Sequence, residues 1–511
     1  MTDVVIGSGP SGVSVATALL RRGRQVLMLD GGRTLGPETQ DRKGRMAASD
    51  PSEWSAEDLG DWQAPQFDSP PGQVRRYGSD FAMEPGQETF VRPQGIGLRA
   101  SHATGGLSNL WGAAVLPNRA ADMADWPIGI DELAPHYQAV AEFLPVSGRT
   151  DDLQDVFPAF PMQGLSALSH SPQAGRILDR LNRSKADLAD MGVRSGASRL
   201  AVNPGCRYCG QCLHGCPWGL IYSATQSLDN LFRHAGFQHR TGLVRRFEEA
   251  GSHVALTLAD GEILRAGRVF VATGVLETAR LLLASHPDQS RKLRLQDSQH
   301  LFLPSLHRWR VSPRPDQRPY HTLPQIFVEV DDPQISPYLV HSQIYTWNEF
   351  YAHDLITRYG AKLPGSAPLW NMLARRLIVA QVFLHSAHSP QIELSLAPDG
   401  RLSPSVLPNS ATHGVMKAAS SRLAQVLNKA GCTALTFASR PGEPGSSFHT
   451  GGSVPMSRNP VPGQADTLGR PRGLERVHIV DASCLPSIPA TTITFTVIAN
   501  AHRIGSLAPE D

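Results

Sequence analysis

The sequence predicts an α/β fold in which a discontinuous, Rossmann-like dinucleotide-binding domain is joined to a second domain built on β-sheet. Three observations lead to this prediction. Residues 4–30 follow the order strand, glycine-rich turn, helix, strand, which is the βαβ unit of dinucleotide-binding folds. The same alternation returns at residues 268–284 and 477–504. Between these segments, residues 300–400 carry β-rich runs interrupted by prolines, which favours strands.

The size and charge of the chain limit what it can be. It has 511 residues, with 48 Lys and Arg against 46 Asp and Glu, and a net charge of +2. This length allows two or more domains, and the balanced charge argues against nucleic acid as the main partner. No apolar run reaches the roughly 18–20 residues of a membrane span. The folded pattern starts close to Met1, so no signal peptide and a cytoplasmic location are expected, with co-export alongside a partner left open.

The first elements are defined by apolar runs and the residues that break them. Residues 4–6 form a short apolar run before the glycine-rich turn, and residues 13–22 continue with helical spacing. A glycine ends that helix, and residues 25–29 return as a strand. Residues 34–95 are rich in proline, glycine and charge without a sustained period. They are expected to form a long excursion rather than a domain.

Three glycines of the first turn and one acidic residue predict the chemistry of this unit. Gly7 permits the tight turn, Gly9 lets the backbone approach a pyrophosphate, and Gly12 allows the helix to pack closely on the sheet. The pyrophosphate then rests at the helix N-terminus, where free N–H groups favour an anion. Asp30, at the end of the next strand, is placed to bind a ribose hydroxyl. These residues predict a dinucleotide site and leave FAD and NAD both open.

The later elements follow the same two periods. A glycine-rich stretch at residues 105–112 precedes a predicted helix over residues 131–144, with Asp131 as its N-cap. The remaining predicted elements are a strand at 268–272, a helix at 276–284, a strand at 477–481 and a helix at 494–504.

Four of the six cysteines fall within eleven residues, which favours a metal site over a disulfide scaffold. The motif, which has bacterial ferredoxin spacing and a following proline, consists of Cys206, Cys209, Cys212 and Cys216. Short spacings of this kind let several thiolates from one loop converge on an iron–sulfur cluster. Zinc sites normally use two separated pairs, and a second pair is absent from the sequence. A purely structural role of the cysteines is the other alternative.

The number of cysteines limits the kind of cluster. A second cubane would need more thiolates than the six cysteines of this chain supply. The favoured arrangement is one [4Fe–4S] cluster completed by Cys216. The alternatives are a fourth ligand from Cys432 or Cys484, or a [3Fe–4S] centre on three cysteines. Cys432, in a predicted helix, and Cys484 are more simply explained as buried small residues.

Ordered motifs along the chain resemble the glucose–methanol–choline (GMC) family of flavin-dependent oxidoreductases, in particular its pyranose-oxidase-like branch. Besides the N-terminal turn, these motifs are GGLSNLW at 105–111, DWPI at 125–128, ATGVLETARLL at 272–282, HTGGSVPM at 449–456, VDAS at 480–483 and ANA at 499–501. The resemblance implies FAD as the cofactor. The further residues it implies for cofactor binding are Gly105, Gly106, Ser108, Asn109, Gly274, Asp481 and Thr494.

The resemblance also implies a reaction. His449 would take the hydroxyl proton of an alcohol, sugar or glycoside while a hydride passes to the flavin, and imidazole suits this task near neutral pH. Thr492 stands where the family usually has a second catalytic residue, His or Asn. Relatives with a covalent flavin have a histidine in place of Leu110, so noncovalent FAD is expected here.

With an iron–sulfur cluster, the expected enzyme is a dehydrogenase that passes electrons to an external carrier, with an electron-acceptor protein or small subunit as partner. Two alternatives stay open. One is an oxidase that uses dioxygen and has structural cysteines. The other is a flavin and iron–sulfur electron-transfer protein without an alcohol substrate.

The motifs also predict how the chain is divided. The FAD-binding domain is expected in four parts, at residues 1–35, 95–150, 223–290 and 446–511, and the last part carries the catalytic histidine. The iron–sulfur loop is expected at residues 200–222, and the substrate domain at residues 291–445.

Overall fold

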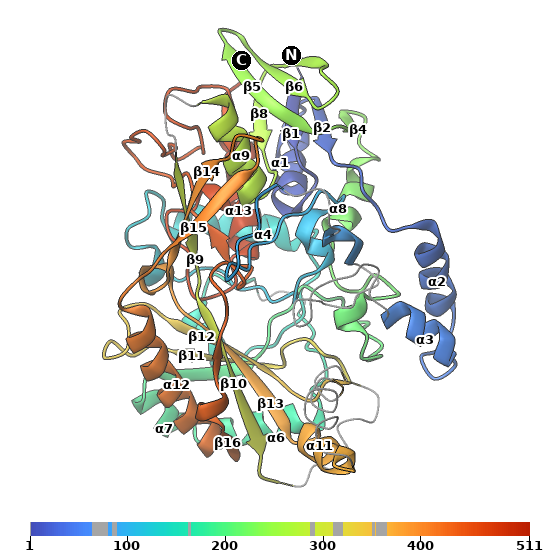
Figure 1. The fold of residues 1–511 in the computed structure, drawn as a ribbon, viewed down its shortest axis with the longest axis vertical. Helices are drawn as coiled ribbons and strands as arrows, with labels where there is room; N and C mark the ends of the chain where they lie inside the picture. Colours follow the sequence, from blue (N-terminus) through green and yellow to red (C-terminus); the bar gives the residue numbers. More distant parts are fainter. Residues whose placement is uncertain are drawn as a thin grey trace.

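The computed structural model describes residues 2–63, 80–83, 89–161, 165–286, 292–309, 320–349, 353 and 365–510. Its upper part in Figure 1 is an α/β layer, and its lower part is a large antiparallel sheet with helices on one side. The α/β fold class predicted from the sequence is therefore confirmed. In the described part of the chain, none of the helices combines the length and apolar character that crossing a bilayer requires.

The α/β layer is built on a five-stranded sheet whose pairings are all parallel. In spatial order its strands are β19 (Val477–Ile479), β8 (Val269–Val271), β1 (Asp3–Ile6), β2 (Val26–Asp30) and β4 (Phe237–Thr241). The helices of this layer are α1 (Pro10–Arg21), α4 (Ile130–Ala141), α8 (Ala224–Leu231), α9 (Val275–Ser285) and α13 (Thr494–Leu507). The central strands are buried throughout, because helices cover a parallel sheet on both faces.

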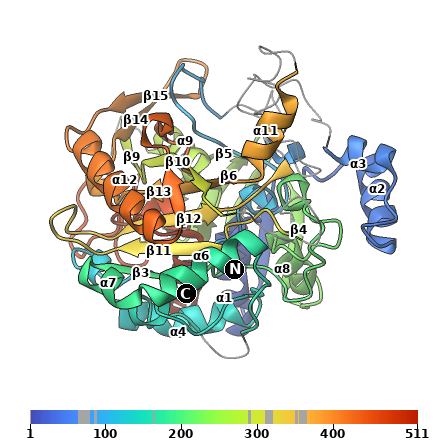
Figure 2. The same cartoon turned by 90° about the horizontal axis from the view of Figure 1, so that it is seen from below.

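The second domain is built on a seven-stranded sheet. Its strands are β16 (Cys432–Ala434), β10 (His300–His307), β13 (Leu377–Phe383), β12 (Val340–Tyr345), β11 (Ile326–Val330) and β3 (Val193–Ala197), with β17 (Arg440–Pro441) paired to β10. Its helices are α6 (Pro172–Arg183), α7 (Lys185–Asp190) and α12 (Thr412–Lys429). Figure 2 shows these helices together at the lower side of the molecule.

The two faces of this sheet have opposite chemistry, and this positions the site. Ile326, Val328 and Ile344 belong to one apolar cluster with side chains of α6 and α12. Residues of opposite parity, such as Glu329 and Gln343, lie on the other face, because side chains alternate along a strand. That polar face is directed toward the α/β layer.

Smaller elements complete the fold. A four-stranded sheet contains β15 (Leu402–Leu407), β14 (Gln391–Leu396), β9 (Leu293–Asp297) and β18 (Thr450–Gly451), and a three-stranded sheet contains β5 (Val244–Ala250), β6 (His253–Leu258) and β7 (Ile263–Ala266). The other α-helices among the described residues are α2 (Pro37–Ala48), α3 (Ala56–Gln63), α5 (Leu153–Val156) and α11 (Ala367–Ala374). Figures 1 and 2 show α2 and α3 at the side of the molecule.

Two sequence predictions about elements are wrong, and one segment contains helices that the sequence did not predict. The expected excursion contains α2 and α3; each buries a single side chain, Met46 or Trp62, and so leaves almost no apolar period to detect. Cys432 begins strand β16 and is not helical, because Gly431, with φ +81°, turns the chain after α12. The N-cap of α4 is Gly129, whose N–H donates to the Glu132 side chain, and Asp131 lies inside the first turn.

Candidate functional site

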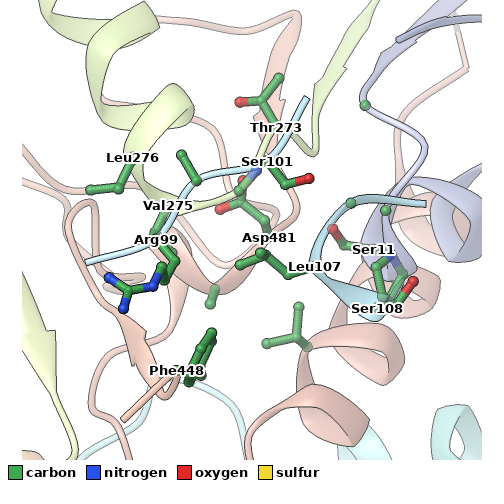
Figure 3. Close-up of a pocket in the computed structure, with 18 of the residues that line it drawn as sticks. Ser11, Arg99, Ser101, Leu107, Ser108, Thr273, Val275, Leu276, Phe448 and Asp481 are labelled. Carbon is green, nitrogen blue, oxygen red and sulfur yellow. The ribbon is translucent and has the colours of Figure 1, made fainter. Parts of the chain in front are cut away.

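One large cavity, about 340 Å³ in volume, lies between the parallel sheet and the polar face of the seven-stranded sheet. This volume is in the range of about 300–1,000 Å³ that is typical of small-molecule sites. Its walls include the turn after β1 (residues 6–11), the end of β2 (residues 29–31) and the turn after β8 (residues 272–277). The cavity therefore opens at the carboxyl ends of the parallel strands, where α/β folds bind their ligands. Figure 3 shows side chains from these segments around it.

The first glycine turn has the close packing that its motif predicts. Gly7 has φ +103°, and a Cβ placed on it would lie 2.4 Å from the Ala272 carbonyl oxygen. A Cβ on Gly12 would lie 1.9 Å from the Gly7 carbonyl oxygen, so the strand, turn and helix touch through backbone. Gly9 has open space beside it and lines the cavity together with Gly7, whereas Gly12 lies behind the wall. This cradle fits a backbone-bound pyrophosphate.

Asp30 lines the cavity and carries a network of hydrogen bonds. Its carboxylate accepts from the Ser8 hydroxyl, from the Gly32 N–H at 2.6 Å and from the Thr104 hydroxyl at 3.0 Å. Burial alone would raise the pKa of Asp30, but these bonds and nearby His239 hold it below its ordinary value. Asp30 is therefore an ionised acceptor at the cavity edge, as binding of a sugar hydroxyl requires.

The second glycine motif divides into cavity-lining and supporting residues. Gly106 and Ser108 line the cavity. Gly105, with φ +83°, and Asn109 lie behind them. The Asn109 amide donates to the carbonyls of Thr104 at 3.0 Å and Gly106 at 2.8 Å, so Asn109 holds the shape of the turn and is not in the wall.

The β8–α9 turn is fixed from the opposite side by Asp481. Its carboxyl accepts from the Gly274 N–H at 2.9 Å and the Thr278 hydroxyl at 2.5 Å, and burial raises its pKa. Gly274, Asp481 and Thr494 at the start of α13 all line the cavity. Leu110 is buried against Ala103 outside the cavity-lining set.

His449 and Thr492 line the same cavity. Nδ1 of His449 and Oγ1 of Thr492 are buried, and neither has a hydrogen-bond partner among the described residues. Burial, helped by His341 and His300, lowers the pKa of His449 to about 3. The imidazole is therefore uncharged near pH 7, the form in which a base must start, and the same burial weakens it as a proton acceptor. Buried polar atoms usually have hydrogen-bond partners, so unpartnered ones in a cavity wall indicate that a bound ligand supplies the partner.

Asp297 is a residue that the sequence reasoning missed. It lies at the end of β9, and its buried carboxylate accepts from the Gly445 N–H at 2.7 Å and the Ser447 hydroxyl at 2.6 Å. The Ser447 hydroxyl oxygen in turn accepts from the backbone N–H of His449 at 2.9 Å. Asp297 thus fixes the loop that presents His449. No sequence motif marks it, because the pairing of β18 with β9 brings it there.

We expect Asp297 to set the acidic limb of the activity profile. Burial raises the pKa of Asp297 to about 6. As the pH falls through this value, the carboxylate gains a proton and loses an acceptor for the 445–449 loop, whereas His449, with a pKa of about 3, stays neutral. Flavin reduction should therefore slow below about pH 6. Asp297→Asn should be slower at every pH and lack this limb in stopped-flow measurements; an unchanged limb would contradict the assignment.

Glu277, in the first turn of α9, is a second missed residue of the cavity wall. Burial alone would raise its pKa, but His102 at 3.1 Å, Arg280 at 2.7 Å and Thr89 at 2.5 Å bring the pKa to about 2. It is a permanently ionised acceptor whose partners come from distant segments. Only the ETAR sequence of the motif could have drawn attention to it.

The four clustered cysteines line a separate small cavity, about 20 Å³ in volume, and all four are free thiols. Burial raises the pKa of Cys212, and neighbouring thiols raise it further. Within the described ranges, however, no group of three or more His, Cys, Asp or Glu side chains could hold a metal ion. The residue types fit an iron–sulfur cluster, but their arrangement is not that of a metal centre, so the predicted ligand role is not confirmed.

The helices α2 and α3 cover this cysteine loop. The Trp62 indole donates to the Gly215 carbonyl at 3.3 Å, and the Trp218 indole donates to the Ala47 carbonyl at 2.9 Å. Trp54 stacks on Trp218, with ring centroids 5.3 Å apart. The loop is thus enclosed by aromatic side chains.

Comparisons with known proteins agree with this geometry. Residues 4–332 match the family model described as FAD dependent oxidoreductase, and residues 391–501 match the model described as GMC oxidoreductase. Among curated protein sequences, none matches the chain significantly. A similar solved structure is that of pyridoxine 4-oxidase from Mesorbium loti, with a TM-score of 0.63 and 16% identity over 99% of this chain and 98% of that one. The chain therefore belongs to the FAD-dependent oxidoreductases, and its C-terminal part matches the GMC oxidoreductase model.

Proposed function

We propose that this oxidoreductase oxidises a hydroxyl-bearing carbon of a small alcohol, sugar or glycoside, with His449 as the base. The observation that carries the proposal is a neutral buried histidine, with one unpartnered ring nitrogen, in the wall of the cavity that the glycine turns also line. Bound FAD supplies the acceptor for a hydride, and the protein supplies position and polarity.

The protein residues divide the remaining work. His449 accepts the hydroxyl proton as the carbon is oxidised, and Thr492 donates or accepts one hydrogen bond beside it. Asp297 orients the histidine loop. We assign the pyrophosphate to Gly7 and Gly9, with Gly12 supporting the turn. The other residues proposed to line the FAD site are Asp30, Gly106, Ser108, Gly274, Asp481 and Thr494, and Gly105 and Asn109 support it by shaping the second glycine turn. We also propose the division into domains that the sequence predicts.

Noncovalent attachment of the flavin follows from Leu110. A leucine side chain offers no atom that can bond to the flavin ring. We therefore expect all FAD to pass into the supernatant when the holoenzyme is precipitated with acid, as measured by absorbance of both fractions. Yellow colour retained in the washed pellet would contradict this expectation.

We further propose that the cysteine loop holds an iron–sulfur cluster, preferably [4Fe–4S], with [3Fe–4S] as the alternative, and that electrons leave to a carrier protein or small subunit. The ferredoxin spacing supports this proposal, and the small cavity that the four cysteines line would have to widen to take a cluster. Such a cluster supplies one-electron transfer. Binding it requires the thiol side chains to turn toward one another.

Cys216→Ser tests the proposed ligand set. Gly215, with φ +96°, turns the chain before Cys216 and lets it fold back toward the other three. We expect the variant to lose iron and sulfide or to change its electron paramagnetic resonance signal to that of a three-iron centre. Cys432→Ser is the matched control, because that thiol is buried in β16 far along the chain. An unchanged cluster in Cys216→Ser would exclude this ligand.

A second candidate is an oxidase that passes electrons to dioxygen and uses the cysteines structurally. It is favoured by the absence, among the described residues, of a side-chain group arranged to hold a metal. Iron analysis together with peroxide measurement during turnover in air separates the two candidates, because peroxide without iron supports the oxidase alone.

The proposed reaction is tested by anaerobic spectroscopy. The holoenzyme is mixed with a panel of alcohols, sugars and glycosides, and bleaching of the flavin is followed in the absence of oxygen. Reduction by at least one hydroxyl compound is expected. If none of them reduces the flavin, the alcohol-oxidising function is wrong and a pure electron-transfer role takes its place.

A further inference from the structure

Four polar side chains form a continuous line on the cavity-facing side of the seven-stranded sheet. Glu329 of β11 lies opposite His341 of β12, and Gln343 and Tyr345 follow at alternate positions along β12. Gln343 and Tyr345 line the cavity. Glu329 and His341 lie behind them, with side chains 1% and 0% exposed. The line therefore begins in the protein interior and ends at the substrate side of the cavity.

Each member is hydrogen-bonded to the next. Nδ1 of His341 is 2.7 Å from Oε1 of Glu329, and Nε2 of His341 is 3.2 Å from Nε2 of Gln343. The Tyr345 hydroxyl donates to Oε1 of Gln343 at 2.8 Å. An isolated buried carboxylate is costly, so a charged or strongly polar partner at this end of the line is required.

The Gln343 side chain fixes the direction of the bonds in the line. Its amide nitrogen can only donate, so Nε2 of His341 is the acceptor, and Nδ1 of His341 carries the ring proton and donates to Glu329. The Gln343 oxygen accepts the proton of Tyr345. Because the Tyr345 hydroxyl donates its proton to Gln343, its oxygen meets a ligand in the cavity as an acceptor.

We propose that Glu329, His341, Gln343 and Tyr345 form a subsite that recognises the O–H of a second hydroxyl group next to the carbon being oxidised. This inference rests on the proposed function and narrows its substrate class to vicinal diols, which include sugars. Tyr345 binds the second hydroxyl. Glu329 and His341 are positioning residues, because they set the direction of the hydrogen bonds that makes the Tyr345 oxygen an acceptor.

The substrate test compares three rigid probes: cis-1,2-cyclohexanediol, its monomethyl ether and cyclohexanol. The ether retains the size of the diol without the second O–H. We expect the parent holoenzyme to be reduced by the diol with a kcat/KM about 10- to 100-fold above that for the ether, because a site built for an O–H rejects analogues that lack it. In Tyr345→Phe the ratio should fall to near one, and Glu329→Gln should lower it in the same direction.

Tyr338→Phe is the matched control, because this tyrosine stacks on His385 outside the cavity wall. It should keep the parental preference for the diol. A parental enzyme that prefers the ether, or a Tyr345→Phe variant with an unchanged ratio, would overturn the subsite. If none of the three probes bleaches the flavin, the result counts against the proposed function for such alcohols. The direction of the hydrogen bonds from Glu329 to Tyr345 is then tested by a measurement that needs no substrate.

Nitrogen NMR of the histidine side chains shows which ring nitrogen of His341 carries the proton, and therefore the direction of these hydrogen bonds, without any substrate. With ¹⁵N-histidine in the holoenzyme and His341→Asn for assignment, the signal of His341 should show a proton on Nδ1 only. A doubly protonated ring would reverse the bonds through Gln343, make Tyr345 a donor and overturn the proposal.

Discussion

His449→Ala should reduce its flavin about 10²- to 10⁴-fold more slowly than the parent enzyme, because a positioned general base contributes about this factor. The FAD content should not change, since the histidine is not part of the glycine cradle. The measurement is the stopped-flow rate of anaerobic bleaching with any reducing substrate found in the panel.

Two further variants separate loss of the base from loss of packing around His449. Phe383 stacks on the His449 ring with centroids 4.8 Å apart, so an alanine leaves a gap. His449→Gln fills most of that gap without a titratable ring and should be as slow as the alanine variant. His388→Ala, outside the cavity wall, should retain the parental rate. If His449→Gln restored the parental rate, packing rather than proton transfer would explain the effect.

Gly12→Ala should yield protein without bound FAD and with greatly reduced thermal stability. The added Cβ would lie 1.9 Å from the Gly7 carbonyl oxygen. The oxygen belongs to the main chain and the Cβ is bonded directly to it, so neither atom can rotate away. Relief requires α1 to separate from β1 at the centre of the parallel sheet. We expect the free energy of unfolding to fall by about 4 kcal/mol or more, a size that single substitutions reach only when they disrupt packing severely.

Two other glycines are the controls for this prediction. Gly9→Ala meets no atom within 4 Å in the protein and should fold, but bind FAD more weakly, because its Cβ enters the space assigned to the pyrophosphate. Gly414→Ala, in α12 with equally open surroundings, should bind FAD normally. The measurements are the FAD-to-protein ratio and the midpoint of thermal unfolding. A Gly12→Ala protein with full FAD content and an unchanged midpoint would show that the close packing is dispensable.

The sequence by itself determined the α/β layer and the family. The motif around Gly7, Gly9 and Gly12 is local, since a tight turn between a strand and a helix needs glycine whatever surrounds it. The HTGGSVPM and ATGVLETARLL segments similarly lie on consecutive residues. For the same reason the sequence missed α2 and α3, whose single buried side chains leave no apolar period.

Only the tertiary structure decided which residues surround His449. Asp297 reaches its loop through the pairing of β18 with β9, and Glu329 meets His341 through the register of β11 and β12. The depressed pKa of His449 likewise depends on burial by segments far apart in the chain. Strand pairing and burial are set by contacts between distant residues, so no local pattern encodes them. The cysteine motif shows what a local pattern leaves undetermined. Its spacing indicates which thiols can meet, but the positions of their side chains depend on the packing around them.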